Sequence, residues 1–558
     1  MRSRRRLVTL ALVLATQLAV VVVWLAFTPN VALRRQLMQL QFWVLETQFI
    51  LIVALSLVNV RQMVRFLRPT RQSLIAAFLL AAGAWALVVA VAPRTNRIYY
   101  DEHIYEGIAQ NLSDLHRAQM CNEGIVEYGS LQCSRAEYNK EPNGFPYLVS
   151  VGYRIFGVHT FVAHGLNALC AAALVFVVFL IACTLFNERA GVFAALVAAL
   201  IPQQLAWSHT AAVEPSAALT CAMAMLAALH YARVKSTLSL VGMTSTVAFA
   251  LQFRPESILV LPVIALILAL FASESFTQRR FWWAVSFGVA LCMLHAGHLF
   301  AMRNEGWGAN ESRMSIRYLW PNFKVNGPFY INNHRFPALY TVLALCGLAL
   351  QPRRAAAVPC LMFMLFWTVY LVFYAGSYEY GADVRFSLMT YPAIAVLAGG
   401  GAAALLALAT AHGWNTRRTA SLFAMAVAAQ FLDFAPQVRA LGEEAWGARA
   451  DVVFAEMVAR ELPPNSVVLT HNPSIFLING VNAAQMSLAT TDSAYVWSQF
   501  PIRFAGGVYL HWNAWCNYDD PAQKAFCSTT LAKFPHALFK EYRERDYRFA
   551  FYRLTLKK

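Results

Sequence analysis

The chain has 558 residues, of which 59% are hydrophobic and only 13% are charged. A soluble globular domain carries about 25% charged residues, so this composition excludes one. The formal net charge of +16 first suggests a nucleic-acid partner. The basic residues, however, stand in short clusters between apolar runs, at 2–6, 61–72, 232–235, 278–280, 351–354 and 415–418. Lys and Arg collect in short cytoplasmic loops of membrane proteins, so the charge indicates membrane topology and no nucleic acid is expected.

The apolar runs predict a polytopic α-helical membrane protein with about 13 transmembrane helices, because roughly 20 apolar residues cross a bilayer core. The first run exceeds the roughly 7–15 apolar residues of a signal peptide, which favours a retained helix. With a cytoplasmic N-terminus, every basic cluster falls on the cytoplasmic side and the C-terminus on the opposite side. The predicted spans are 7–27, 44–60, 73–93, 160–185, 190–206, 214–232, 237–252, 256–272, 281–300, 338–350, 357–375, 384–410 and 418–434.

The composition changes from about residue 451 onward. "LPPNSVVLTHNPSIFLING" (462–480) is typical of a turn, a short β-branched strand and a helix start, and "YRFAFYRLTL" (547–556) of a closing strand. We therefore expect three parts: residues 1–72 with two N-terminal helices and a basic cytoplasmic loop, a transmembrane core at 73–434 with a large loop at 94–146, and a small extracytoplasmic α/β domain at 435–558. That domain either contacts the active site or an acceptor, or only stabilises the protein.

The ten cysteines fit this topology. Six lie in or beside predicted spans, where cysteine acts as a small apolar residue: Cys170, Cys183, Cys221, Cys292, Cys346 and Cys360. The other four form two close pairs in segments expected outside the cytoplasm, where disulfides persist. We predict disulfides within both pairs, although four cysteines allow three pairings: Cys121 with Cys133, and Cys516 with Cys527.

Ionisable residues gather on the extracytoplasmic side of the predicted bundle. Such residues are costly near a membrane and usually line a water-filled functional cavity. Each also has a simpler explanation, such as a helix cap for Asp101, a solvated face for Glu102 and Glu106, an exposed loop for His103, or a headgroup-anchored Arg254. The set comprises Asp101, Glu102, His103, Glu106, Lys140, Glu141, His209, Glu214, Arg254, Glu256, Glu379, Asp383 and Arg385.

Asp101 is predicted to be the N-cap of a short helix, "EHIYEGIAQNL" (102–112). A carboxylate is favoured there by the free backbone N–H groups and the helix dipole, and Tyr105 follows one turn later on the same face. The neighbouring acidic and imidazole side chains have the chemistry to hold a divalent cation. No spacing requires one, so we assign no metal and no cofactor.

Two motifs carry a family resemblance. "DEHIYEGIAQNL" (101–112) opens the first large loop, and "NKEPNGFPYLVSVGYRIFG" (139–157) closes it with a Lys-Pro segment and an amphipathic stretch. This layout resembles the C-type glycosyltransferase superfamily, specifically the protein O-mannosyltransferase and lipid A aminoarabinose transferase family of polyprenyl-phosphate-sugar enzymes. Weaker similarities are "FRPES" (253–257) and "VRFSLMTYPAIAVLAGG" (384–400). The aminoarabinose branch has Arg where this chain has Ile104, and Pro where it has Glu141.

The resemblance implies a transferase that moves a sugar from a polyprenyl-phosphate donor to a lipid, glycan or protein acceptor at a bacterial inner membrane. It implies Asp101 as the base, with Glu102 as the second carboxylate of its motif. A departing phosphate needs no general acid, unlike the alkoxide expelled in glycoside hydrolysis, so one base and fixed positive charge should suffice. The expected substrate-binding residues are Lys140, Arg254 and Arg385 for the phosphate, and Tyr105, His209, Glu214 and Glu256 around the sugar.

Two other functions remain open from the sequence. A lipid or solute transporter would show internal repeats and helices broken near the midplane; no repeat is evident, and the charges lie at one face. A polysaccharide polymerase or ligase would use lipid-linked oligosaccharides and depend on Arg and His in large loops. The loop 301–337, with Arg303, Arg313, Arg317, His334 and Arg335, keeps that alternative open.

Overall fold

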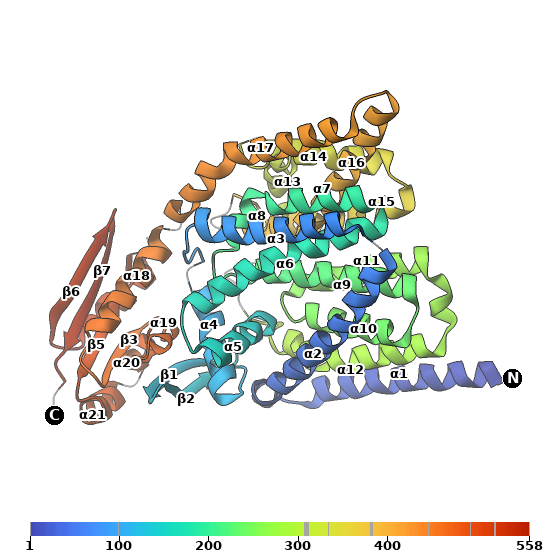
Figure 1. Ribbon diagram of the computed structural model, residues 1–558. Helices are drawn as coiled ribbons and strands as arrows, with labels where there is room; N and C mark the ends of the chain where they lie inside the picture. Colours follow the sequence, from blue (N-terminus) through green and yellow to red (C-terminus); the bar gives the residue numbers. More distant parts are fainter. Residues whose placement is uncertain are drawn as a thin grey trace.

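The computed structural model describes residues 2–67, 69–98, 100–305, 312–332, 334–379, 383–444, 446–491, 493–517 and 520–556. Within these ranges the chain forms a helical bundle and one mixed sheet (Figure 1). Every predicted span contains a helix: α1 (Arg2–Phe27), α2 (Asn30–Leu67), α3 (Arg71–Val91), α6 (Phe161–Leu185), α7 (Glu188–Ala199), α9 (Glu214–Val234), α10 (Thr237–Ala250), α11 (Val260–Phe271), α12 (Arg279–Ala301), α14 (Ala338–Leu350), α15 (Arg353–Leu371), α16 (Tyr391–Ala411) and α17 (Thr416–Glu444).

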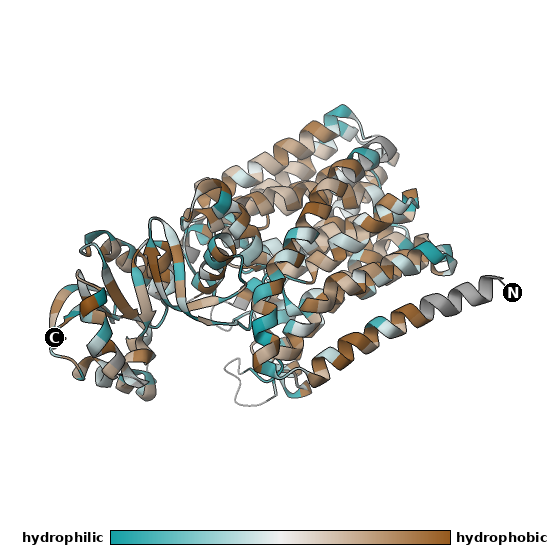
Figure 2. Cartoon of the chain, turned by 90° about the horizontal axis from the view of Figure 1, so that it is seen from below, coloured by the Kyte–Doolittle hydropathy of each residue, from teal (hydrophilic) through white to brown (hydrophobic). Residues whose placement is uncertain are grey.

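The described helices confirm a polytopic membrane protein. Eight segments are long and apolar enough to cross a membrane: Asn30–Val58, Arg71–Val91, Phe161–Leu185, Glu214–Val234, Arg279–Ala301, Arg353–Leu371, Val384–Ala411 and Thr416–Ala440. Shorter apolar helices lie at Leu12–Phe27, Thr237–Ala250, Pro255–Phe271 and Ala338–Leu350. Figure 2 shows hydrophobic residues over most of the bundle and hydrophilic ones gathered mainly at helix ends and beside the C-terminal domain.

Small residues let two bundle helices touch. A Cβ on Gly347 of α14 would lie 2.0 Å from the carbonyl oxygen of Leu397, and one on Gly401 of α16 would lie 1.9 Å from that of Leu343. Close backbone approach through glycine is a common way for membrane helices to associate. The glycines at the end of the "VRFSLMTYPAIAVLAGG" segment also pack closely, since a Cβ on Gly399 would lie 2.4 Å from the carbonyl oxygen of Ala190 in α7.

The segments between the spans carry further elements. The first large loop contains α4 (Asp101–Leu115), β1 (Met120–Glu127), β2 (Ser130–Glu137) and α5 (Gly144–Phe156). In Figure 1, α4 and α5 lie where the bundle meets the C-terminal domain. The other connections contain α8 (Pro202–Trp207), η1 (Pro255–Leu259), η2 (Ser273–Thr277), η3 (Ile316–Tyr318), α13 (Leu319–Phe329) and η4 (Asp383–Thr390).

The C-terminal part is an α/β domain, as expected. Its elements are α18 (Trp446–Glu461), β3 (Ser466–Thr470), α19 (Ser474–Ile478), β4 (Asn482–Gln485), α20 (Met486–Thr491), α21 (Ser493–Arg503), β5 (Gly507–Trp512), η5 (Ala514–Asn517), α22 (Pro521–Ala532), β6 (His536–Glu544) and β7 (Tyr547–Leu554). The strand order is β2-β1-β4-β3-β5-β7-β6. The central strand β3 is buried along its whole length and pairs in parallel with β4 and β5, which is why its sequence is a continuous apolar run.

The sheet joins two distant parts of the chain. Strand β1, from the first large loop, pairs antiparallel with β4 through Glu123 and Gly124. The C-terminal domain expected at 435–558 did not include the hairpin formed by β1 and β2. The structure also contains disulfides within both predicted pairs: Cys121–Cys133 joins β1 to β2, and Cys516–Cys527 joins η5 to α22.

Candidate functional site

Helix α4 begins one residue earlier than its motif suggested. Tyr100 is the N-cap, with φ +78° and ψ −53°, and Asp101 is the first helical residue. Asp101 and Glu102 both lie in the first turn, where negative charge is stabilised by the helix dipole. The predicted N-cap role of Asp101 is therefore off by one position, but its place at the positive end of the helix is as expected.

Asp101 faces a cavity of about 540 Å³, which is within the usual size range of ligand sites. Four cationic and three acidic side chains contribute to its wall. The polar lining residues are Asp101, Tyr105, Lys140, Glu141, Arg254, Glu256, Arg313, Tyr370, Tyr374 and Arg385. The apolar lining residues are Pro255, Ile258, Leu259, Met314, Val369, Phe373, Ala375 and Phe386. A charged, partly apolar cavity of this kind suits a ligand with an anionic group and a hydrocarbon chain.

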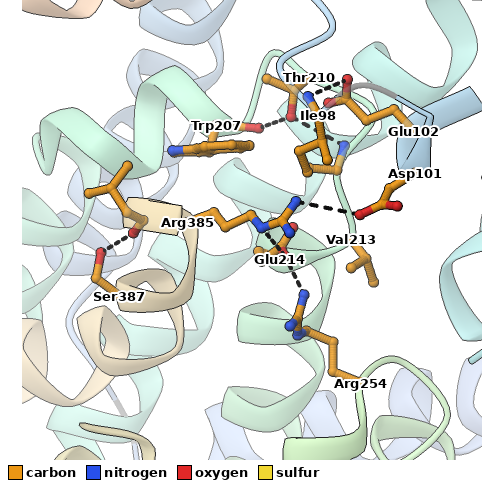
Figure 3. Close-up of polar contacts among 12 residues, drawn as sticks. Ile98, Asp101, Glu102, Trp207, Thr210, Val213, Glu214, Arg254, Arg385 and Ser387 are labelled. Atoms are coloured by element: carbon orange, nitrogen blue, oxygen red, sulfur yellow. Dashed lines mark hydrogen bonds and ion pairs between the residues drawn. The ribbon is translucent and has the colours of Figure 1, made fainter. Parts of the chain in front are cut away.

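Arg385, from η4, links Asp101 to a buried acid. Its Nη1 lies 3.8 Å from Asp101 Oδ2, and its Nε lies 3.3 Å from Glu214 Oε1 (Figure 3). Glu214 is 1% exposed and also pairs with Arg254. One buried carboxylate therefore pairs with two guanidinium groups beside the cavity, and it also accepts a hydrogen bond from Arg254.

Other cavity residues also hold Arg254 in place. Arg254 pairs with Glu256, which accepts a hydrogen bond from the hydroxyl of Tyr370. The ring of Tyr370 stacks on Phe386 with centroids 4.7 Å apart. The guanidinium carbons of Arg254 and Arg385 lie 5.1 and 5.0 Å from the Phe386 centroid, within the range of cation–π contacts.

Lys140 and Glu141 reach the cavity from the segment before α5. This segment is anchored at Gly144, whose N–H donates to the carbonyl oxygen of Gln252 at 2.8 Å. A Cβ at Gly144 would lie 2.7 Å from that oxygen, so only glycine allows this approach. Burial and the charge of Asp101 raise the pKa of the Glu141 carboxyl to about 7. Glu141 belongs to the predicted set of ionisable residues but was assigned no role, although its position next to Lys140 was a usable signal.

Several predicted site residues lie outside the cavity wall. His209 donates from Nδ1 to the carbonyl oxygen of Ala92 at 2.6 Å, and Glu214 lies behind the two arginines. The simpler explanations of an exposed His103 and a solvated Glu106 are wrong: both side chains are buried, and His103 Nδ1 lies 3.1 Å from Glu106 Oε2. Tyr105 does line the cavity and packs edge-on against the ring of Phe145 in α5.

Glu102 is fully buried and does not line the cavity. Its Oε2 accepts hydrogen bonds from the backbone N–H groups of Arg97 at 2.7 Å and Ile98 at 3.3 Å. It thus closes the tight loop that leads into α4. Burial raises the pKa of the Glu102 carboxyl from 4.5 to about 8, against the opposing effect of the two hydrogen bonds.

This raised pKa predicts a specific pH dependence of stability. Between pH 4.5 and about 8 the folded protein keeps a proton on Glu102 that the unfolded chain loses. Stability should therefore fall with rising pH in this window, by at most about 1.4 kcal/mol per unit from this group. Glu102→Gln should flatten that slope in thermal unfolding between pH 5 and 8. Glu127→Gln, at the exposed end of β1, is the control, and an unchanged slope in Glu102→Gln would contradict the assignment.

The residues near Asp101 do not gather around a common metal position. In the described ranges, the one group with metal-ligand spacing is His471, Cys516 and Cys527. Its two cysteines form a disulfide and are not available as thiolate ligands. Asp101 faces the cavity, Glu102 binds backbone, and His103 pairs with Glu106, so these side chains point to three different places.

Comparisons with known proteins agree with the family resemblance that the two sequence motifs carry. The model of the dolichyl-phosphate-mannose-protein mannosyltransferase family matches residues 140–298. No curated protein matches the sequence. ArnT from Cupriavidus metallidurans bound to undecaprenyl phosphate is similar in structure, with a TM-score of 0.56, 15% identity, and coverage of 87% of this chain and 98% of ArnT.

The Archaeoglobus fulgidus oligosaccharyltransferase in its apo form is also similar, with a TM-score of 0.52, 13% identity, and coverage of 84% of this chain and 73% of that one. AglB from the same organism, in complex with an inhibitory peptide and a dolichol-phosphate, has a TM-score of 0.51, 12% identity, and coverage of 86% and 74%. The chain thus has the fold of the C-type glycosyltransferase superfamily, as the motif resemblance predicted.

Proposed function

We propose that the protein is a membrane glycosyltransferase that moves a sugar from a polyprenyl-phosphate-linked donor to an acceptor hydroxyl. The observation that carries this proposal is that Asp101 lines one cavity together with Lys140, Arg254 and Arg385. A base and the cations needed by a departing phosphate therefore lie side by side. The similar ArnT and AglB structures contain undecaprenyl phosphate and dolichol-phosphate, and both ligands are polyprenyl phosphates.

In the proposed reaction, the acceptor oxygen attacks the anomeric carbon of the sugar. The bond from that carbon to the donor phosphate oxygen breaks, and the phosphate leaves with the bonding electrons. Asp101 takes the proton of the acceptor hydroxyl. Its side chain is 27% exposed, so an acceptor can reach it. General-base assistance of this kind is worth about 10²–10⁴-fold in rate.

The cationic side chains that line the cavity stabilise the departing phosphate. Arg254 and Arg385 are already oriented by Glu214 and Glu256, so little reorganisation is needed when charge develops on the phosphate. Preorganised charge is usually the largest catalytic contribution. Lys140 and Arg313 add two further cations to the same wall. Tyr105, Glu141 and Glu256 offer hydrogen-bonding groups for the sugar.

The proposal includes a location. Because the basic clusters fall on the side opposite the first large loop, we place the N-terminus in the cytoplasm, and the cavity and C-terminal domain outside it. A bacterial inner membrane with an extracytoplasmic active site fits this arrangement. The two disulfides, Cys121–Cys133 and Cys516–Cys527, are expected in that oxidising compartment.

The decisive experiment compares a strain that lacks the gene with its parent by mass spectrometry of glycolipids and glycans. We expect one class of product to lose the mass of a single sugar, and to regain it on complementation. Loss of an oligosaccharide would instead support the polymerase or ligase, an alternative that is favoured by the position of Arg313 in the cavity wall. Unchanged products with altered solute uptake would support a transporter.

A further inference from the structure

The residue directly before Asp101 touches the C-terminal domain. The ring of Tyr100 lies against the indole of Trp515 in η5, with centroids 5.2 Å apart and planes tilted by 56°. Tyr100 has φ +78°, a backbone conformation that a bulky residue adopts only when its surroundings hold it there. Its carbonyl oxygen accepts the first helical hydrogen bond of α4, from Ile104 at 2.8 Å. The geometry of Tyr100 therefore determines how α4 starts.

Trp515 is itself held firmly. Its backbone N–H donates to Asn513 Oδ1 at 3.0 Å, and Asn513 Nδ2 donates to His471 Nδ1 at 2.9 Å. The next residue, Cys516, is bonded to Cys527. The short η5 segment is thus tied to the domain by side-chain hydrogen bonds and a covalent link, so it presents the indole to Tyr100 in a fixed position.

The same domain contacts α4 a second time, about two turns further on. A Cβ on Gly107 would lie 2.1 Å from Ser474 Oγ at the start of α19. Gln110 Nε2 donates to the carbonyl oxygen of Leu477 at 3.2 Å. In Figure 1, α19 lies beside α4 between the sheet and the bundle. Helix α4 is therefore held by the C-terminal domain at its first turn and along its middle.

We propose that Trp515 is a positioning residue for the transfer reaction, acting through Tyr100 to fix the first turn of α4 and with it the carboxylate of Asp101. This inference rests on the proposed function. It gives the C-terminal domain a defined task, which is to orient the base. Misplacing a reacting group by about 1 Å can cost about 100-fold in rate, so a contact one residue away from the base can affect turnover strongly.

The first test needs no substrate. In the full-length protein, Trp515→Ala should raise hydrogen exchange of the α4 first-turn amides, Ile104 included, and Trp515→Phe should not. Trp446→Ala is the matched control, because it removes a tryptophan from another aromatic pair of the same domain, with Tyr547 at 4.6 Å. Equal exchange in Trp515→Ala and Trp446→Ala would overturn the proposal.

The second test separates binding from turnover. Trp515→Ala should lower the rate of forming the product missing from the deletion strain by about 10–100-fold, while thermal stabilisation by added undecaprenyl phosphate stays unchanged. Trp515→Phe should restore most of the rate. Tyr100→Ala, which leaves the C-terminal domain untouched, should match Trp515→Ala, and the double variant should be no worse than either. Additive losses would overturn the proposal.

The two proposals can fail separately. If the deletion strain keeps every sugar of its parent, the proposed function is wrong whatever Trp515 does. If Asp101→Asn is inactive and Trp515→Ala performs like Trp446→Ala, only the positioning role is wrong.

Discussion

Asp101→Asn is expected to reduce sugar transfer by about 10²–10⁴-fold, leaving little measurable activity. Asparagine keeps the size and the first-turn position of the side chain but cannot accept the proton of an acceptor hydroxyl. Arg385 keeps its second partner, Glu214, at 3.3 Å, so the cavity wall should stay in place. The measurement is the rate of product formation in membranes of the deletion strain that express the variant at the parental level.

The control for this variant lies on the same helix. Asp114 accepts a hydrogen bond from the backbone N–H of Leu131 at 2.9 Å and does not line the cavity. Asp114→Asn keeps an oxygen for that bond and should retain activity. Undecaprenyl phosphate should stabilise Asp101→Asn as well as the parent protein, because the phosphate-binding cations are unchanged. A fully active Asp101→Asn would remove Asp101 from the chemistry.

Several cavity residues could be predicted from the sequence because of one physical constraint on charged side chains. Ionisable groups beside apolar helices are costly unless water or a ligand reaches them, so charged residues from four distant segments were expected at one face. Asp101, Lys140, Arg254 and Arg385 do line one cavity. Helix positions were also predictable, because they depend on local apolar runs. The roles of these residues in catalysis remain proposals.

Burial on the other face of α4 was not predictable in this way. Glu102 and Glu106 follow a helical spacing typical of a solvated surface, yet both are buried. Helix α4 packs against a C-terminal domain that starts more than 300 residues later. The pairing of β1 with β4 is equally long-range. Neither contact leaves a local pattern in the sequence, since each depends on where a distant segment docks.

The residues missed at the cavity have a similar explanation. Arg313 reaches the wall because Ser315 N–H donates to the carbonyl oxygen of Val372, and Tyr374 N–H donates to that of Arg313. These two hydrogen bonds join a loop to the end of α15. In the sequence, Tyr370 is one aromatic residue among others in an apolar helix. Its role depends on the hydrogen bond that its hydroxyl donates to Glu256, and only the structure shows this bond.

Glu214→Ala is expected to have the largest effect on stability. Glu214 is 1% exposed and is shared by Arg254 and Arg385. Its loss leaves two neighbouring guanidinium groups with one fewer counter-ion, and breaking a buried ion pair costs about 3–5 kcal/mol. Arg254 keeps Glu256 and Arg385 keeps Asp101, so a cost near the lower end is expected. The measurement is the midpoint of thermal unfolding in detergent.

The same variant should also lose activity, for a separate reason. Without Glu214, the charge of Arg385 is balanced chiefly by Asp101, which makes that carboxylate a weaker base, and both arginines lose the orientation they offer to a phosphate. Glu274→Ala is the matched control, because Glu274 also pairs with a cation, Lys235, but both side chains are exposed; it should change neither stability nor rate, since exposed pairs contribute little. A Glu214→Ala protein as stable and as active as the parent would show that the shared carboxylate does not organise the cavity, and that Glu256, Asp101 and the aromatic residues are sufficient to position the two arginines.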